Sequence, residues 1–96
     1  SISAGLDYPG VSPIHCFLKD AKRARYTAAT DEAALNAYKL VTKLEKIKPS
    51  LEPSHAFAEA IKISPKLSRD TIIIVNSCGD AKKDRDILKA RLGKVR

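Results

Sequence analysis

The sequence predicts an α/β fold: a fragment of a parallel-sheet, three-layer domain with about four helices and two strands. The main observation is the run TIIIV at residues 71–75, where β-branched residues follow one another without alternating with polar ones. Such a run is typical of an interior strand buried on both faces of a parallel sheet. The second observation is that this run and a shorter extended segment alternate with helical patterns. Because two short strands cannot cover such a strand, we expect residues outside this chain to complete the sheet.

The predicted order is loop, helix, strand, helix, helix, strand, helix. Residues 1–10 end in a Pro-Gly turn signal and are predicted to form a loop. Ser12 and Pro13 are typical of a helix start, as the capping residue and the first helical residue. That helix closes over residues 19–23. Residues 25–29 form the shorter predicted strand.

Thr30 begins the next helix, with two acidic residues in its first turn, where the helix dipole favours negative charge. Its apolar stripe consists of Ala33, Ala37, Leu40, Val41 and Leu44. Pro49 and Pro53 bracket a connector, and Ser54 is predicted to cap a third helix. After the buried strand, Gly79 marks a turn before a last helix.

The last predicted helix runs from about Asp84 to Leu92. No internal repeat or low-complexity tract separates the elements, and 96 residues are enough for one small domain and not for two. We therefore predict a single segment over residues 1–96. A core with so few aromatic residues would be thin, which indicates a part of something larger.

Composition excludes several classes of protein. Hydrophobic residues make up 44% and charged residues 30%, which is typical of a globular chain. The net charge of +7 suggests nucleic-acid binding, but acids interrupt the densest basic run, Lys82, Lys83, Arg85, Lys89, Arg91, Lys94 and Arg96. A solvated basic face is the better interpretation. Two cysteines give no disulfide framework, and no apolar run is long enough for a signal peptide or a membrane span. We expect a cytoplasmic protein with free thiols.

The opening sequence SISAGLDYPGV (residues 1–11) resembles a signature stretch of the tryptophan synthase β subunit, a pyridoxal-phosphate enzyme of fold type II. The resemblance continues through LKD at 18–20, RA at 23–24, TDEAAL at 30–35, PSLEPSHA at 49–56 and IVN at 74–76. It covers the whole chain as the C-terminal part of the larger cofactor-binding domain. It implies a lyase of tryptophan biosynthesis that replaces the hydroxyl of L-serine by indole.

The resemblance implies roles for residues of the first loop. Asp7 matches an aspartate that helps to close the site over the amino-acid substrate. Gly5 matches a backbone position beside the cofactor ring, where the missing side chain allows a close approach. Tyr8 and Gly10 match positions whose backbone carbonyls help to hold a monovalent cation. The alternative for Asp7 is an ordinary turn residue before Pro9.

Further site residues come from two later blocks. Glu52 matches a catalytic-site glutamate near the cofactor ring, and its alternative is a solvated acid at a helix start. Cys78 and Gly79 match the cofactor-binding turn, with Cys78 at the position of a serine that hydrogen-bonds the pyridine nitrogen. The alternative for Cys78 is an inert core thiol. His15 and His55 are too far apart in sequence to indicate a metal site or a catalytic triad.

The turn departs from the family pattern Ser-Gly-Arg-Gly-Asp-Lys-Asp. Asp80 stands at the arginine position, Ala81 at a glycine and Lys82 at an aspartate, so an ion pair with reversed partners is one alternative and its loss is the other. No lysine stands in a context like that of the Schiff-base lysine, and no glycine-rich loop could hold a phosphate. We therefore expect the fragment alone to be inactive. The resemblance implies as partners the rest of the β subunit, an α subunit and a second β subunit. Rival interpretations are another fold type II enzyme and a non-catalytic basic interaction module.

Overall fold

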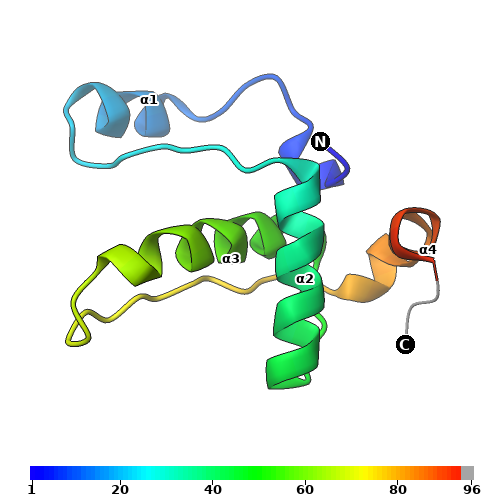
Figure 1. The fold of residues 1–96 in the computed structure, drawn as a ribbon. Coiled ribbons are helices and arrows are strands. Elements are labelled where there is room, and N and C mark those ends of the chain that lie inside the picture. Colours follow the sequence, from blue (N-terminus) through cyan, green and yellow to red (C-terminus); the bar gives the residue numbers. More distant parts are fainter. Residues whose placement is uncertain (94–96) are drawn as a thin grey trace.

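The structure, a computed structural model, describes residues 1–93 as helices joined by extended segments (Figure 1). The α-helices are α1 (Pro13–Asp20), α2 (Asp31–Glu45), α3 (Leu51–Ile63) and α4 (Arg85–Leu92). Three short 3-10 helices, η1 (Ala4–Leu6), η2 (Ser64–Lys66) and η3 (Ala81–Asp84), lie between them. Residues 1–93 thus hold four α-helices, but the predicted combination of about four helices with two strands does not occur.

The starts of α1 and α2 follow from their capping residues. Ser12 Oγ accepts a hydrogen bond from the Ile14 N–H at 3.1 Å, and Pro13 occupies the first turn, where no N–H is needed. Thr30 Oγ1 accepts from the Ala33 N–H at 3.1 Å in the same way. Both helix starts were predicted at these residues.

Helix α3 begins at Leu51, earlier than the sequence predicts. We expected Ser54 to cap it, but Ser54 lies inside the first turn and its Oγ donates to the Ser50 carbonyl at 2.7 Å. Pro53 is tolerated there because the first N–H groups of a helix have no partner within the helix. The missing cap comes from a distant residue: Asp84 Oδ2 accepts from the Leu51 N–H at 2.9 Å.

The predicted strands are wrong: residues 1–93 contain no β-strand. Residues 25–29 and 71–75 are extended but pair with no other segment, because the described chain offers no neighbouring strand to which their backbone groups could bond. The α/β fold class is thereby corrected to helices and coil. Ile72 and Ile74 are 85% and 90% exposed, whereas Ile73 is 40% exposed, so only one side of the run is partly covered.

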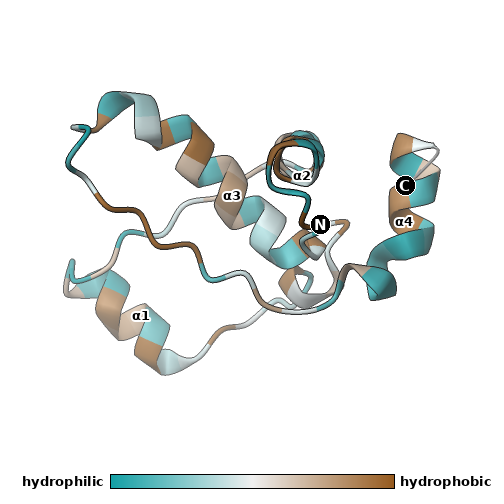
Figure 2. Cartoon of the chain, turned by 90° about the horizontal axis from the view of Figure 1, so that it is seen from below, coloured by the Kyte–Doolittle hydropathy of each residue, from teal (hydrophilic) through white to brown (hydrophobic). Residues whose placement is uncertain are grey.

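The core lies where α2, α3 and α4 meet. Leu35 and Tyr38 of α2, Leu51 of α3 and Leu88 of α4 form its buried cluster. The radius of gyration is 14.4 Å, against about 12.5 Å for a compact domain of this length. The thin core predicted from the composition is confirmed by this small cluster. Helix α1 and the extended segments lie away from it (Figures 1 and 2).

Helix α4 ends at Leu92, the predicted boundary, and the next residue, Gly93, has the positive φ of 76° that a helix end favours. Of the basic run, Lys94 and Arg96 lie outside the described residues. Within residues 1–93, every helix is too short or too polar to cross a lipid bilayer.

Candidate functional site

Three segments that are distant in sequence meet at the first turn of α3. The Gly5 N–H, in η1, donates to Glu52 Oε1 at 2.9 Å. From the other side, Lys83 Nζ in η3 binds Glu52 Oε2 at 2.7 Å and Oε1 at 3.0 Å. Glu52 therefore joins the opening motif to the glycine-containing turn near the end of the chain. We call Gly5, Glu52, Lys83 and Asp84 the junction.

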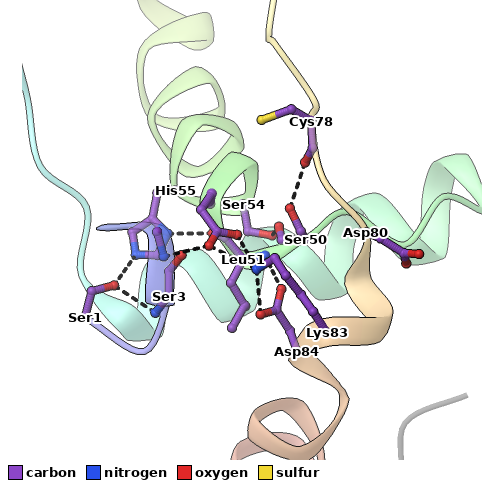
Figure 3. A network of polar contacts seen from close by, with 12 residues as sticks. Ser1, Ser3, Ser50, Leu51, Ser54, His55, Cys78, Asp80, Lys83 and Asp84 are labelled. Atoms are coloured by element: carbon purple, nitrogen blue, oxygen red, sulfur yellow. Dashed lines mark hydrogen bonds and ion pairs between the residues drawn. The ribbon is translucent and has the colours of Figure 1, made fainter. Parts of the chain in front are cut away.

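Asp84 anchors the junction in the core. Its side chain is 3% exposed, and its two oxygens have different partners. Oδ1 lies 2.9 Å from Lys83 Nζ, and Oδ2 accepts from the Leu51 N–H at 2.9 Å (Figure 3). A buried carboxylate is tolerated when it is paired and hydrogen-bonded in this way. Lys83 thus bridges one buried and one partly exposed carboxylate.

The junction keeps both of its titrating partners charged. Burial raises the pKa of Glu52, but the hydrogen bonds from Lys83 and from the Gly5 N–H outweigh it, and the pKa falls from 4.5 to about 2. Burial lowers the pKa of Lys83, but the hydrogen bonds to Glu52 and Asp84 outweigh it and raise the pKa above 10.5. Glu52 is therefore an ionised carboxylate at neutral pH. That state suits positioning of the backbone better than proton transfer, for which a pKa near neutrality is needed.

A second contact fixes the turn that carries Cys78. Ser50 Oγ donates to the Cys78 carbonyl at 2.8 Å (Figure 3). Gly79 follows with φ +83°, and a Cβ on it would lie 2.8 Å from Ser50 Oγ. Both the positive φ and the close approach require glycine at this position. The residue before α3 and the turn before η3 are thereby held together.

Cys78 is exposed, so residues 1–93 by themselves do not bury its thiol in a core. Its position at a cofactor ring stays a prediction. The chain places Cys78 and Gly79 beside the junction through Ser50, whose neighbour in sequence, Leu51, is bonded to Asp84. The cofactor-binding residues predicted from the turn therefore lie on the same end of α3 as Gly5 and Glu52.

Asp7, Tyr8 and Gly10 lie in the loop after η1, and the structure does not bring them into the junction. The Asp7 side chain is 71% exposed and its Oδ1 lies 3.4 Å from the Ser1 amine. Tyr8 is 76% exposed. A Cβ on Gly10 would meet no atom within 4 Å. Their predicted roles in substrate closure and cation binding stay predictions.

The two histidines occupy separate places. His15 Nδ1 lies 2.8 Å from the Tyr26 hydroxyl, and His55 Nδ1 donates to the Leu51 carbonyl at 2.7 Å. In the part of the chain that the structure describes, no group of three His, Cys, Asp or Glu residues could hold a metal ion.

A cavity of about 410 Å³ opens beside the junction, along one side of α3. Glu52, His55 and Glu59 of α3 line it together with Leu6 and residues 27–29. The cavity therefore lies between α3, the end of η1 and the extended segment that we predicted to be a strand. Its size is in the range of small-molecule sites.

Sequence reasoning missed Lys83 and Asp84 as site residues. A signal was present, because the Lys-Asp pair is the part of the turn that keeps the family pattern while Asp80 and Lys82 depart from it. The reversed ion pair between those two does not occur in residues 1–93. Instead Asp80 Oδ1 accepts from the Lys82 backbone N–H at 2.9 Å, and the Asp80 side chain points away from Lys83 (Figure 3).

Comparison with known proteins bears directly on the predicted resemblance. No family model matches the chain. The chain is 58% identical over 84 residues to the tryptophan synthase beta chain of Fusobacterium nucleatum subsp. nucleatum, which covers 88% of this chain and 21% of the relative. It is 54% identical over 93 residues to that of Cereibacter sphaeroides, covering 97% of this chain and 23% of the relative.

A third relative, the tryptophan synthase beta chain of Bordetella petrii, is 50% identical over 93 residues, or 97% of this chain. The chain spans 21% to 23% of the length of these relatives. The predicted resemblance is confirmed at identities far above those at which chance similarity is a concern. This chain is therefore a relative of the C-terminal segment of tryptophan synthase β chains.

Proposed function

We propose that this chain acts as the C-terminal part of a tryptophan synthase β chain, a pyridoxal-phosphate-dependent lyase that joins L-serine and indole into L-tryptophan by β-replacement. One observation carries the proposal: the hydrogen bonds of Glu52 with Gly5 and Lys83. These residues come from three separate blocks that resemble the family, although the third block, residues 78–84, departs from the family pattern at Asp80, Ala81 and Lys82. Their convergence at one end of α3 supports a common site rather than three independent structural features.

In this proposal Cys78 and Gly79 would form one edge of a pyridoxal-phosphate site. Cys78 offers an exposed thiol for the ring nitrogen, although a thiol is a weaker hydrogen-bonding group than the family's serine hydroxyl. The space beside Gly5, which we expected to allow a close approach of the cofactor ring, is taken by Glu52 in this chain, because a Cβ there would lie 2.8 Å from Oε1. When bound, the cofactor supplies an electron sink. The lysine that anchors it and the loop that holds its phosphate would come from other parts of the subunit.

Within that site the junction would orient the chain rather than move protons. Glu52 is held ionised and holds the Gly5 backbone in place, while Lys83 fixes the turn that carries Cys78 and Gly79. Asp7, exposed in this chain, would close over the amino-acid substrate. The backbone carbonyls of Tyr8 and Gly10 would help to hold a monovalent cation.

The partners follow from the same proposal. The chain would assemble with the rest of the β chain, an α subunit and a second β chain, and we place this assembly in the cytoplasm. Exposed apolar side chains among the described residues support this assembly, because another part of the protein would cover them. The most exposed are Ile72 and Ile74, at 85% and 90%.

A chimera tests the proposal. The 93 matching residues of the Cereibacter sphaeroides β chain are replaced by those of this chain, and tryptophan formation from serine and indole is measured. We expect the chimera to form tryptophan and the 96-residue chain alone to form none and to bind no stoichiometric pyridoxal phosphate. Cys78→Ser in the chimera should keep or raise turnover. A folded chimera without tryptophan formation would contradict the proposal.

Asp7 gives a sharper test within the chimera. Asp7→Ala should slow turnover more than about tenfold, which corresponds to about 1.4 kcal/mol of barrier, because a charged hydrogen bond is strengthened when closure excludes water. The free energy of unfolding should hardly change. If stability falls while turnover per folded molecule is kept, Asp7 is a turn residue.

A further inference from the structure

A second cavity lies against η3, and none of the four junction residues lines it. Its volume is about 340 Å³, within the range of small-molecule sites. Tyr38 of α2 and Leu88 of α4 form its apolar part, and both belong to the buried core cluster. Lys48 precedes α3, and Lys82 and Arg85 come from η3 and the start of α4. The cavity therefore combines an apolar wall with three cationic side chains.

The two adjacent lysines of η3 have different surroundings. Lys83 is paired with Glu52 and Asp84, whereas Lys82 lines the second cavity. Among the described residues, Lys48, Lys82 and Arg85 form no ion pair. Asp80 is the one carboxylate that lines the cavity, and its Oδ1 already accepts the Lys82 backbone N–H at 2.9 Å.

Three cations around one cavity repel one another, and a single carboxylate does not balance them. An anion that entered would relieve this repulsion. The apolar wall strengthens the attraction, because charges next to a low-dielectric surface are less screened than charges in open water. Arg85 adds directional donors that suit tetrahedral or planar oxyanions.

We propose that this cavity binds a phosphate monoester, with the phosphate on Lys48, Lys82 and Arg85 and the organic part against Tyr38 and Leu88. The proposal is independent of the proposed function, because the junction and its cavity share none of these five residues. Lys82 stands where the family motif has an aspartate, so the site would distinguish this chain from relatives that keep the motif.

The test uses phenyl phosphate and inorganic phosphate as probes. Each is titrated into the ¹⁵N-labelled 96-residue chain at constant ionic strength, and amide shifts are followed. We expect saturable shifts at Ala81, Lys82 and Arg85, with phenyl phosphate at least about threefold tighter because its ring meets the apolar wall. A phosphate-containing single-stranded oligonucleotide should bind no tighter per phosphate than inorganic phosphate. Tighter oligonucleotide binding, shifts that do not saturate, or a spectrum that stays undispersed with and without phosphate would each overturn the proposal.

A matched pair of variants distinguishes specific binding in this cavity from nonspecific attraction of anions to a chain of net charge +7. Lys82→Glu should weaken phenyl phosphate binding by about tenfold or more. Lys66→Glu makes the same change at an exposed lysine of η2, outside the cavity, and should change the affinity by less than about twofold. Lys82→Arg should retain binding. Equal weakening by both glutamate variants, with dispersed spectra in each, would show that no specific site exists.

Discussion

The junction at the start of α3 and the extended residues 71–75 reverse the usual relation between polarity and burial. The Asp84 side chain is 3% exposed although it carries a carboxyl group, and Ile74 is 90% exposed although it is apolar. The difference lies in the partners that the chain itself supplies. Asp84 has an ammonium group and a backbone N–H within 2.9 Å, whereas residues 71–75 have no neighbouring strand in the described chain. Burial here follows partners rather than hydropathy.

This comparison also explains how a chain with a thin core fixes its turns. The junction ties η1, α3 and η3 through the hydrogen bond of Gly5 with Glu52 and the ion pairs of Lys83 with Glu52 and Asp84. The core cluster then needs to hold only the helices α2, α3 and α4 together. Removing a polar partner from the junction should therefore lower the free energy of unfolding more than replacing an exposed apolar residue does.

The largest effect is expected at Asp84. Asp84→Ala leaves the Leu51 N–H without a partner in the core and should lower the free energy of unfolding by about 2–3 kcal/mol. Asp86→Ala is the matched control, since Asp86 is an exposed acid in the first turn of the next helix and should cost at most about 0.5–1 kcal/mol. Urea unfolding followed by circular dichroism measures both. An equal loss of unfolding free energy in both variants would mean that the buried contacts of Asp84 do not stabilise the fold more than an exposed acid does.

The next effect is a dependence of stability on pH. The pKa of Glu52 is about 2 in the folded chain, well below its ordinary value of 4.5. The stabilisation of the folded chain by the Glu52 carboxylate is therefore complete above pH 4.5 and is lost as the pH falls towards 2. Lys83 is 44% exposed, so solvent screening limits this loss to about 1–2 kcal/mol.

Glu52→Gln should remove that part of the pH dependence. Unfolding curves of both chains between pH 5 and pH 2 should converge at the acidic end, and carbon NMR of the Glu52 carboxylate gives the pKa directly. A carboxylate that titrates near 4.5 would show that Lys83 and Gly5 do not hold it in solution.

A smaller loss of stability is expected for an alanine at Gly5, and the same substitution at Gly10 is the control. A Cβ on Gly5 would lie 2.8 Å from Glu52 Oε1, and Lys83 keeps that carboxylate from moving freely. Gly5→Ala should therefore cost about 1 kcal/mol or somewhat more. Gly10→Ala meets no atom within 4 Å and should change stability by less than about 0.5 kcal/mol. A larger loss of stability for Gly10→Ala than for Gly5→Ala would contradict the close contact between Gly5 and Glu52.

The same comparison shows which features the sequence could predict. The starts of α1 and α2 depend on capping residues next to the helix, so Ser12 and Thr30 were sufficient to locate them. The start of α3 depends on Asp84, which is 33 residues away from Leu51, and local signals misplaced it at Ser54. A helix cap that is supplied by tertiary contact leaves no local pattern.

The prediction of strands was wrong for a related reason. The run at 71–75 carries the composition of a buried strand, but a strand requires a partner whose position no local pattern reports. In the candidate site, the family motifs located Gly5, Glu52 and Cys78. They did not reveal that Lys83, 31 residues from Glu52, joins two of these blocks, because the pairing exists only once the turn is folded.

The smallest effect is expected at Ile74, and it tests the exposed side of the comparison. Ile74→Thr keeps a β-branched side chain at a position that is 90% exposed, so the free energy of unfolding should change by less than about 0.5 kcal/mol. Val75→Thr is the control, because Val75 is half-buried and its replacement by a hydroxyl-bearing side chain of similar shape should cost about 1 kcal/mol. Thermal unfolding of both variants measures the difference. A loss above 1 kcal/mol at Ile74 would mean that the side chain packs in solution, and that the contrast between a satisfied junction and an uncovered apolar segment does not describe this chain.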